Sequence, residues 1–132
     1  PLNTDSTLKG QTVFLAERCA ELMNNDIITD RTVIDVMAFT MNAKSIGHYD
    51  KEIFESYAKE FIREYDYIFY ISPYGIPMED NGVRETDEHY RDLIDFTITT
   101  LIKRYSHMAN KIEKISGSTD ERVEQILKFT NL

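Results

Sequence analysis

The chain has 132 residues, a length that fits one domain built around one modest hydrophobic core. Hydrophobic residues make up 42% of it and charged residues 29%, which excludes a largely disordered or a collagen-like chain. The formal net charge of −8 opposes general binding to nucleic acid or to an anionic membrane surface. No apolar run approaches the roughly 20 residues that span a bilayer.

The cysteine content and the N-terminal segment both favour an intracellular protein. Cys19 is the only cysteine, so a disulfide within the chain is excluded and a reducing compartment is the simpler setting. The first seven residues contain neither the basic nor the apolar segment of a signal peptide. We therefore expect a cytoplasmic protein.

The N-terminal part of the chain is predicted to form two helices with a short strand between them. Apolar residues recur at helical spacing over residues 7–24, and the turn-forming residues 24–26 end this pattern. The β-branched run 27–29 predicts a very short buried strand. Residues 32–41 carry a second helical pattern of apolar side chains.

The middle of the chain predicts a helix, a central strand and a polar loop. Asp50 can accept the free amides of a first helical turn, so we expect it to cap a helix that runs to about residue 64. Residues 67–71 are almost continuously apolar and aromatic, which is typical of a parallel strand covered on both faces. The polar stretch 78–86 contains an Asp-Asn-Gly turn signal at 80–82.

The C-terminal part adds a helix over residues 87–106, a strand over 111–115 and a final helix that begins at Thr119. Alternation of helices and strands favours a single α/β domain over residues 1–132, with a parallel sheet. Three short strands offer too little sheet to cover the apolar stripes of so many helices. We infer that one or two further strands come from the N-terminal side or from a partner chain.

Three charged residues surround the junction between the predicted strand 27–29 and the next helix. Asp30 and Arg31 follow the strand directly, and Asp35 lies one helical turn beyond. In open α/β sheets ligands bind outside the carboxyl ends of the strands, so this junction predicts a binding site. Structural roles are the alternatives. Asp30 would cap the helix that begins at Thr32, while Arg31 would pair with either aspartate. Asp35 would be a solvated carboxylate on the outer helix face.

Four segments resemble, in order and spacing, parts of the phosphate-loop nucleoside and nucleotide kinases: the Walker B strand with its Asp-Arg, the next core strand, the lid, and the loop beside the adenine. These segments are residues 27–35, 65–73, 79–84 and 115–122. The chain is similar in this way to the AAA-type ATPase family that includes ribosylnicotinamide-kinase-like domains. The resemblance implies an α/β, three-layer P-loop NTPase-like domain with a short parallel sheet flanked by helices.

The resemblance also implies chemical roles at the Asp-Arg junction. Phosphoryl transfer needs positioning and charge neutralisation more than covalent chemistry. Asp30 would act at Mg²⁺, orienting a water bound to the ion, or would take the proton from the acceptor hydroxyl. Arg31 would bind an acceptor phosphate or sugar, and Asp35 would contact an acceptor sugar hydroxyl.

The lid and the adenine loop supply the remaining residues that the resemblance implies. Arg84 would cover the γ-phosphate and neutralise charge that develops during transfer, with Arg91 beside it. Asp80 would hold Mg²⁺ or the acceptor, and Gly117 and Arg122 would flank the adenine. The alternatives are structural roles. The two arginines of the lid would form surface ion pairs, and Asp80 would occupy a turn. Gly117 would be an ordinary loop residue and Arg122 an exposed helix residue.

The first segment of that family, a strand followed by Gly-x-x-x-x-Gly-Lys-Ser/Thr and a helix, has no counterpart in this sequence. Because its amides and lysine cradle the phosphates, we expect this chain, with the first βα unit missing, to be inactive alone. The prediction is an ATP-dependent phosphotransferase that uses ATP and Mg²⁺ on a small nucleoside- or nucleotide-like acceptor, without nucleic acid or membrane partners. The alternative is a non-catalytic interaction module on the same scaffold, in which a partner, or self-association as a homo-oligomer through an exposed sheet edge, would replace the missing first unit.

Overall fold

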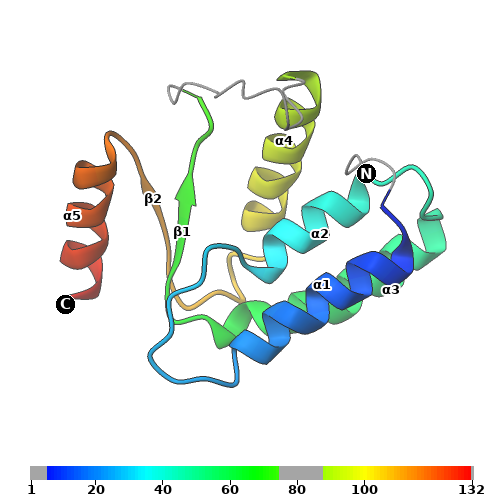
Figure 1. Cartoon of the computed structure of the whole chain (residues 1–132), viewed down its shortest axis with the longest axis horizontal. Helices are drawn as coiled ribbons and strands as arrows, with labels where there is room; N and C mark the ends of the chain where they lie inside the picture. Colours follow the sequence, from blue (N-terminus) through cyan, green and yellow to red (C-terminus); the bar gives the residue numbers. More distant parts are fainter. Residues whose placement is uncertain (1–5, 75–87, 132) are drawn as a thin grey trace.

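The computed structural model describes residues 6–74 and 88–131, which form five α-helices, a 3₁₀ helix and a two-stranded sheet. In chain order these are α1 (Leu8–Glu21), α2 (Val33–Met41), α3 (His48–Ala58), η2 (Lys59–Glu64), β1 (Ile68–Ile71), α4 (Glu88–Arg104), β2 (Ile112–Ile115) and α5 (Thr119–Thr130) (Figure 1). The described residues therefore form an α/β fold with a short parallel sheet, as the alternating patterns predicted.

The parallel sheet joins two distant parts of the chain. β1 and β2 pair over their whole length, with Ile68 opposite Ile112 and Ile71 opposite Ile115. Parallel neighbours need a crossover connection, and α4 lies in the crossover between these two strands. Both strands lie within the segments that the sequence predicted as strands.

A helix lies on each side of the sheet. Successive side chains of a strand point to opposite faces. Tyr70 of β1 donates a hydrogen bond to Asp95 of α4, whereas Phe69 packs against Phe129 of α5 with ring centroids 6.3 Å apart. The two strands therefore lie between α4 and α5, as Figure 1 shows.

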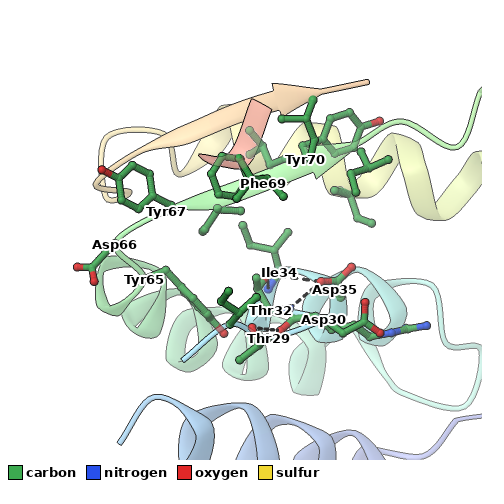
Figure 2. Close-up of a pocket in the computed structure, with 18 of the residues that line it drawn as sticks. Thr29, Asp30, Thr32, Ile34, Asp35, Tyr65, Asp66, Tyr67, Phe69 and Tyr70 are labelled. Carbon is green, nitrogen blue, oxygen red and sulfur yellow. Dashed lines mark hydrogen bonds between the residues drawn. The ribbon is translucent and has the colours of Figure 1, made fainter. Parts of the chain in front are cut away.

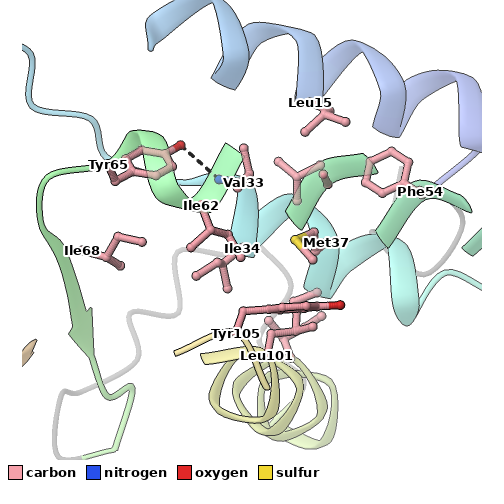
Figure 3. Packing of buried hydrophobic residues seen from close by; sticks show 14 of the residues in the cluster. Leu15, Val33, Ile34, Met37, Phe54, Ile62, Tyr65, Ile68, Leu101 and Tyr105 are labelled. Atoms are coloured by element: carbon pink, nitrogen blue, oxygen red, sulfur yellow. Dashed lines mark hydrogen bonds between the residues drawn. The ribbon is translucent and has the colours of Figure 1, made fainter. Parts of the chain in front are cut away.

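α2 forms the centre of the hydrophobic core because it is apolar on nearly all sides. Its buried residues are Val33, Ile34, Val36, Met37, Ala38 and Thr40. α1, α3 and α4 cover it, and contribute Leu15, Phe54 and Leu101 to the same core (Figure 3). A helix without a polar face is stable only where neighbours cover it in this way. Neither α2 nor any other helix in the described ranges has the length and apolar content that a bilayer crossing requires.

The helical predictions are confirmed, apart from one capping residue. α1, α2, α4 and α5 lie within the predicted ranges, whereas α3 begins at His48, earlier than predicted. Its N-cap is Gly47, which makes no side-chain cap, and Asp50 lies inside the first turn. Asp50 is therefore not the cap, although a carboxylate there still interacts favourably with the helix dipole. The same helical stretch continues from Lys59 as the 3₁₀ helix η2.

Residues 27–29 do not form the predicted strand. They lie in irregular chain between α1 and α2, where Ile27 is 43% exposed and Ile28 is 89% exposed. A β-branched run of three residues forms a strand only where a neighbouring strand pairs with its backbone, and no strand in the described ranges does so. The described sheet therefore has two strands where the sequence predicted three.

Candidate functional site

A large open cleft of about 1940 Å³, which we name the β1 cleft, runs along the first strand. It is bounded by residues 24–32 with the start of α2, by β1, and by one side of α4. Figure 2 shows Asp30 and Asp35 on one side of it and Phe69 and Tyr70 on the other, with Ile34 between them. The volume exceeds the roughly 300–1,000 Å³ typical of small-molecule sites.

The β1 cleft brings together half of the residues that the sequence predicted for a site. These are Asp30, Arg31, Asp35 and Arg91. Arg91 comes from α4, far along the chain from the other three. Gly117 and Arg122 do not line the cleft. Asp80 and Arg84 lie outside the described residues, so their predicted roles stay predictions.

Asp30 is an exposed carboxylate at the edge of the cleft. It makes no hydrogen bond or ion pair with any residue in the described part of the chain. The helix that it was expected to cap begins at Val33 and is capped by Thr32, whose Oγ1 accepts the Ile34 N–H at 3.1 Å. Asp30 is therefore not a helix cap, and its side chain is exposed to solvent.

Asp35 completes the cap of α2. Its Oδ2 accepts the Thr32 backbone N–H at 2.8 Å, so Thr32 and Asp35 form a reciprocal capping box. Burial raises the pKa of the Asp35 carboxyl, and the Thr32 hydrogen bond and the charge of Arg31 offset part of this rise. The interpretation of Asp35 as a solvated carboxylate is therefore wrong, because the residue fixes the turn that carries Asp30 and Arg31.

Arg31 lies against an aromatic ring instead of forming the expected ion pair. Its guanidinium carbon lies 5.5 Å from the centroid of the Phe39 ring. Arg31 makes no ion pair with Asp30, Asp35 or another carboxylate of the described residues. Contact with the ring face leaves the guanidinium N–H groups free to bind an anion in the plane of the group.

Arg91 reaches the same cleft from α4. Its guanidinium carbon lies 5.5 Å from the centroid of the Tyr74 ring, and its Nε lies 3.9 Å from Asp92 Oδ1. The Tyr74 hydroxyl donates to that same oxygen at 2.8 Å. The Nε is buried and makes no hydrogen bond with a described residue. An ion pair with Asp92 is thus present, but its N–O distance of 3.9 Å is long. The guanidinium of Arg91 therefore keeps N–H groups that can bind another acceptor.

The sequence patterns did not identify a tyrosine–aspartate pair that lines the cleft. The Tyr70 hydroxyl donates to the Asp95 carboxylate of α4. Burial raises the pKa of Tyr70 to about 12, and the hydrogen bond to Asp95 adds to the rise. The one signal in the sequence is a tyrosine inside an otherwise apolar strand, since a covered phenol needs a polar partner.

Gly117 and Arg122 have local structural roles in the turn between β2 and α5. Gly117 has a φ of +99°, where an L side chain is strained, and an added Cβ would lie 3.0 Å from Glu121 Oε1. Arg122 donates from Nη2 to Thr119 Oγ1 at 3.1 Å. The structural alternatives account for both residues, and contact with an adenine stays a prediction.

No three His, Cys, Asp or Glu side chains within the described ranges gather into a metal-binding group. Mg²⁺ in nucleotide sites takes one or two carboxylates and completes its shell with waters and phosphate oxygens. Asp30 is the unengaged carboxylate at the Asp-Arg junction. One carboxylate alone does not make up the ligand set that a protein uses for a free divalent cation.

Comparison of the chain with protein-family models, with curated proteins and with solved structures found no match. The resemblance of four segments to phosphate-loop kinases therefore stays a prediction.

Proposed function

We propose that the β1 cleft binds a nucleotide-like ligand and that the chain carries part of an ATP-dependent phosphotransferase with three-layer P-loop architecture. The observation that carries this proposal is the convergence of Asp30, Arg31 and Arg91 on one cleft from two distant segments. An unengaged carboxylate and two guanidinium groups that line one cleft offer one proton acceptor and two anion-binding groups. The proposed reaction transfers the γ-phosphoryl of ATP to a small nucleoside- or nucleotide-like acceptor.

Each described residue has a distinct part in this proposal. Asp30 accepts the proton of the acceptor hydroxyl, because no described residue competes for its carboxylate. Arg31 and Arg91 bind phosphate oxygens, and the aromatic ring against each guanidinium orients its donor plane. Asp35 is a positioning residue that acts through the helix cap. Arg84 and Asp80 join the site through the family resemblance alone.

The charge of the cleft bears on the form of the ligand. Six acidic residues and two arginines line it, so a free polyphosphate meets net repulsion. Bound Mg²⁺ would neutralise part of the charge on a triphosphate, and Asp30 would face the ion through one of its bound waters, which leaves the carboxylate able to accept a proton. We therefore propose ATP together with Mg²⁺, and not ATP alone, as the ligand.

Thermal unfolding with and without ligand tests the proposal. A ligand at 100 times its Kd stabilises a protein by about 2.7 kcal/mol, so millimolar Mg·ATP or a nucleoside should raise the Tm. Arg31→Ala should reduce the rise. Arg63→Ala is the matched control, because this exposed arginine pairs with Glu60 at 3.2 Å and does not line the cleft. The proposal fails if no nucleotide raises the Tm, or if both variants retain the full rise.

A non-catalytic interaction module is the second candidate, and the open edge of β1 favours it. One edge of β1 pairs with β2, and no strand of the described residues pairs with the other. Exposed strand edges bind extended peptides through main-chain hydrogen bonds. A chain that binds an extended peptide but no nucleotide would have this function.

A further inference from the structure

The open edge of β1 presents regular backbone groups that lack a partner. The Ile68 N–H donates to the Lys111 carbonyl at 2.8 Å, so the backbone of Ile68, and by alternation that of Tyr70, faces β2. Phe69 and Ile71 therefore direct their N–H and C=O groups to the opposite edge. No described residue forms a backbone hydrogen bond with that edge. Buried or half-buried backbone groups of this kind require partners.

The β1 cleft lies along this edge, and its walls continue the two faces of the sheet. All of β1 lines the cleft, whereas β2 contributes Ile115 alone. One wall comes from α4, through Ile94 and Ile98, and the other from α5, through Ile126. Because α4 and α5 cover opposite faces of the sheet, the space between them beyond β1 lies where a neighbouring strand would continue the sheet.

The far boundary of this space is the segment 27–29, which runs between α1 and α2. A strand in a sheet lies about 4.8 Å from each neighbour. A strand inserted beside β1 would pair with the Phe69 edge inside the cleft that Ile28, which is 89% exposed, also lines. The cleft volume of about 1940 Å³ leaves room for such a segment and a ligand at the Asp30 end.

The chemistry of the lining indicates what kind of segment fits. Isoleucines from α2, α4 and α5 line the walls, so the inserted side chains must be apolar on both faces. Six acidic residues against two arginines surround them, which favours a segment with basic residues at an end.

We propose that the β1 cleft takes one extended peptide segment of aliphatic residues with a basic end, which pairs with the open edge of β1 as an added strand. This pairing rests on the second candidate function, for which it gives the chemistry of the partner, and it does not depend on nucleotide binding. It completes the sheet next to Asp30 and Arg31, and so it also completes the wall of the proposed ligand site.

The test is an NMR titration of the ¹⁵N-labelled chain with the synthetic peptide Lys-Lys-Val-Ile-Val-Ile-Val. The expected result is a shift of the Phe69 and Ile71 amides, with at least tenfold slower hydrogen exchange at both. Ile112 and Lys114 supply the internal control, since their amides face the outer edge of β2, which lacks the cleft. A peptide with a central proline should bind at least tenfold more weakly.

Two substitutions separate the edges of the sheet. Ile71→Pro removes an N–H that faces the cleft and leaves the hydrogen bonds between β1 and β2 in place, so it should weaken peptide binding at least tenfold. Lys114→Pro makes the same change on the outer edge of β2 and should leave binding unchanged. Should a proline variant fail to fold, the same contrast is available on the peptide. Every second backbone amide of the peptide faces β1 when it pairs as a strand. N-methylation of those amides should therefore abolish binding, whereas N-methylation of the other set, which faces away, should not.

Three results would overturn the proposal. The peptide leaves every amide unmoved, or it shifts Ile112 and Lys114 instead of Phe69 and Ile71. Alternatively, light scattering finds a dimer in which Phe69 and Ile71 are already protected, so that a second copy covers the edge. A nucleotide titration of the same sample, followed at Asp30 and Arg91, reports the proposed function separately, because either titration can fail while the other succeeds.

Discussion

The hydroxyl of Tyr65 accepts a hydrogen bond from the backbone N–H of Val33 at 3.2 Å, across a sequence separation of 32 residues. Val33 is the first residue of α2, where backbone N–H groups lack partners within the helix. Tyr65 stands just before β1 and is 8% exposed. This one contact therefore joins two boundaries of the β1 cleft, the start of α2 and the approach to the strand (Figure 3).

Tyr65→Phe should destabilise the fold because it leaves the Val33 N–H buried without an acceptor. The expected loss in the free energy of unfolding is about 1–3 kcal/mol, measured by urea denaturation. Tyr49→Phe is the matched control, since Tyr49 is 73% exposed. Equal losses in the two variants would show that the hydroxyl of Tyr65 does not hold α2.

Stability should fall at alkaline pH, because the phenols of Tyr65, Tyr70 and Tyr105 are held neutral in the folded chain. Burial is the largest cause, and it raises the pKa of each to about 12. A group whose pKa is higher in the folded than in the unfolded state stabilises the fold below its ordinary pKa of about 10. That contribution is lost as the pH rises from about 10 to about 12.

Urea denaturation between pH 8 and pH 12 measures this loss. The triple variant with phenylalanine at 65, 70 and 105 should start from a lower stability and then change less with pH. A stability that stays level in the original chain through pH 12, or that falls as steeply in the triple variant, contradicts the assignment.

Two substitutions of Asp35 distinguish its role as a helix cap from the effect of its charge. Asp35→Ala removes the acceptor for the Thr32 N–H and should cost about 0.5–2 kcal/mol of stability. Asp35→Asn keeps an acceptor oxygen and should cost less. Because burial raises the pKa of this carboxyl, its stabilising contribution is present below its ordinary pKa and is lost as the pH rises through the folded value.

The stability of Asp35→Asn relative to the original chain should therefore improve as the pH increases from about 4 to 7, as read from chemical denaturation at each pH. Asp50→Ala, in the first turn of α3, is the control without a cap hydrogen bond. A deficit for Asp35→Asn that grows toward neutral pH would mean that the ionised carboxylate stabilises α2.

Gly117→Ala tests whether this glycine is structural. Its φ of +99° is strained for alanine, and the new Cβ would meet Glu121 Oε1 at 3.0 Å, so the variant should lose about 1–3 kcal/mol. Gly47→Ala is the control, because a Cβ added there would have nothing within 4 Å and the φ of Gly47 is −71°. If Gly117→Ala keeps full stability but weakens nucleotide binding, the glycine belongs to a ligand loop.

Helices with strong periodicity could be predicted from the sequence, whereas features that depend on distant partners could not. α4 carries apolar residues at helical spacing, so its existence follows from local pattern alone. The run 27–29 has strand propensity, but a strand also needs a partner, and no described strand pairs with it. The Thr-x-x-Asp pattern at residues 32–35 is the sequence signature of a capping box. It identifies Thr32, and not Asp30, as the N-cap of α2.

The candidate site shows the same division. Asp30, Arg31 and Asp35 are close in sequence, so their proximity follows once α2 is placed. That Arg91 joins them depends on the packing of α4 against α2, and its contact with Tyr74 depends on where the chain goes after β1. Arg122 was predicted by family resemblance at an adenine; the structure shows its local contact with Thr119 in the first turns of α5, and the prediction itself stays untested.

The most direct measurement is an NMR titration of the labelled chain with Mg·ATP. Ligand binding in the β1 cleft predicts saturable shifts of the Asp30, Arg31 and Arg91 amides, and at least a tenfold higher Kd for Arg91→Ala than for Arg63→Ala. Shifts confined to the Gly117–Arg122 turn, or no saturable shift at millimolar nucleotide, would contradict a nucleotide site in this cleft.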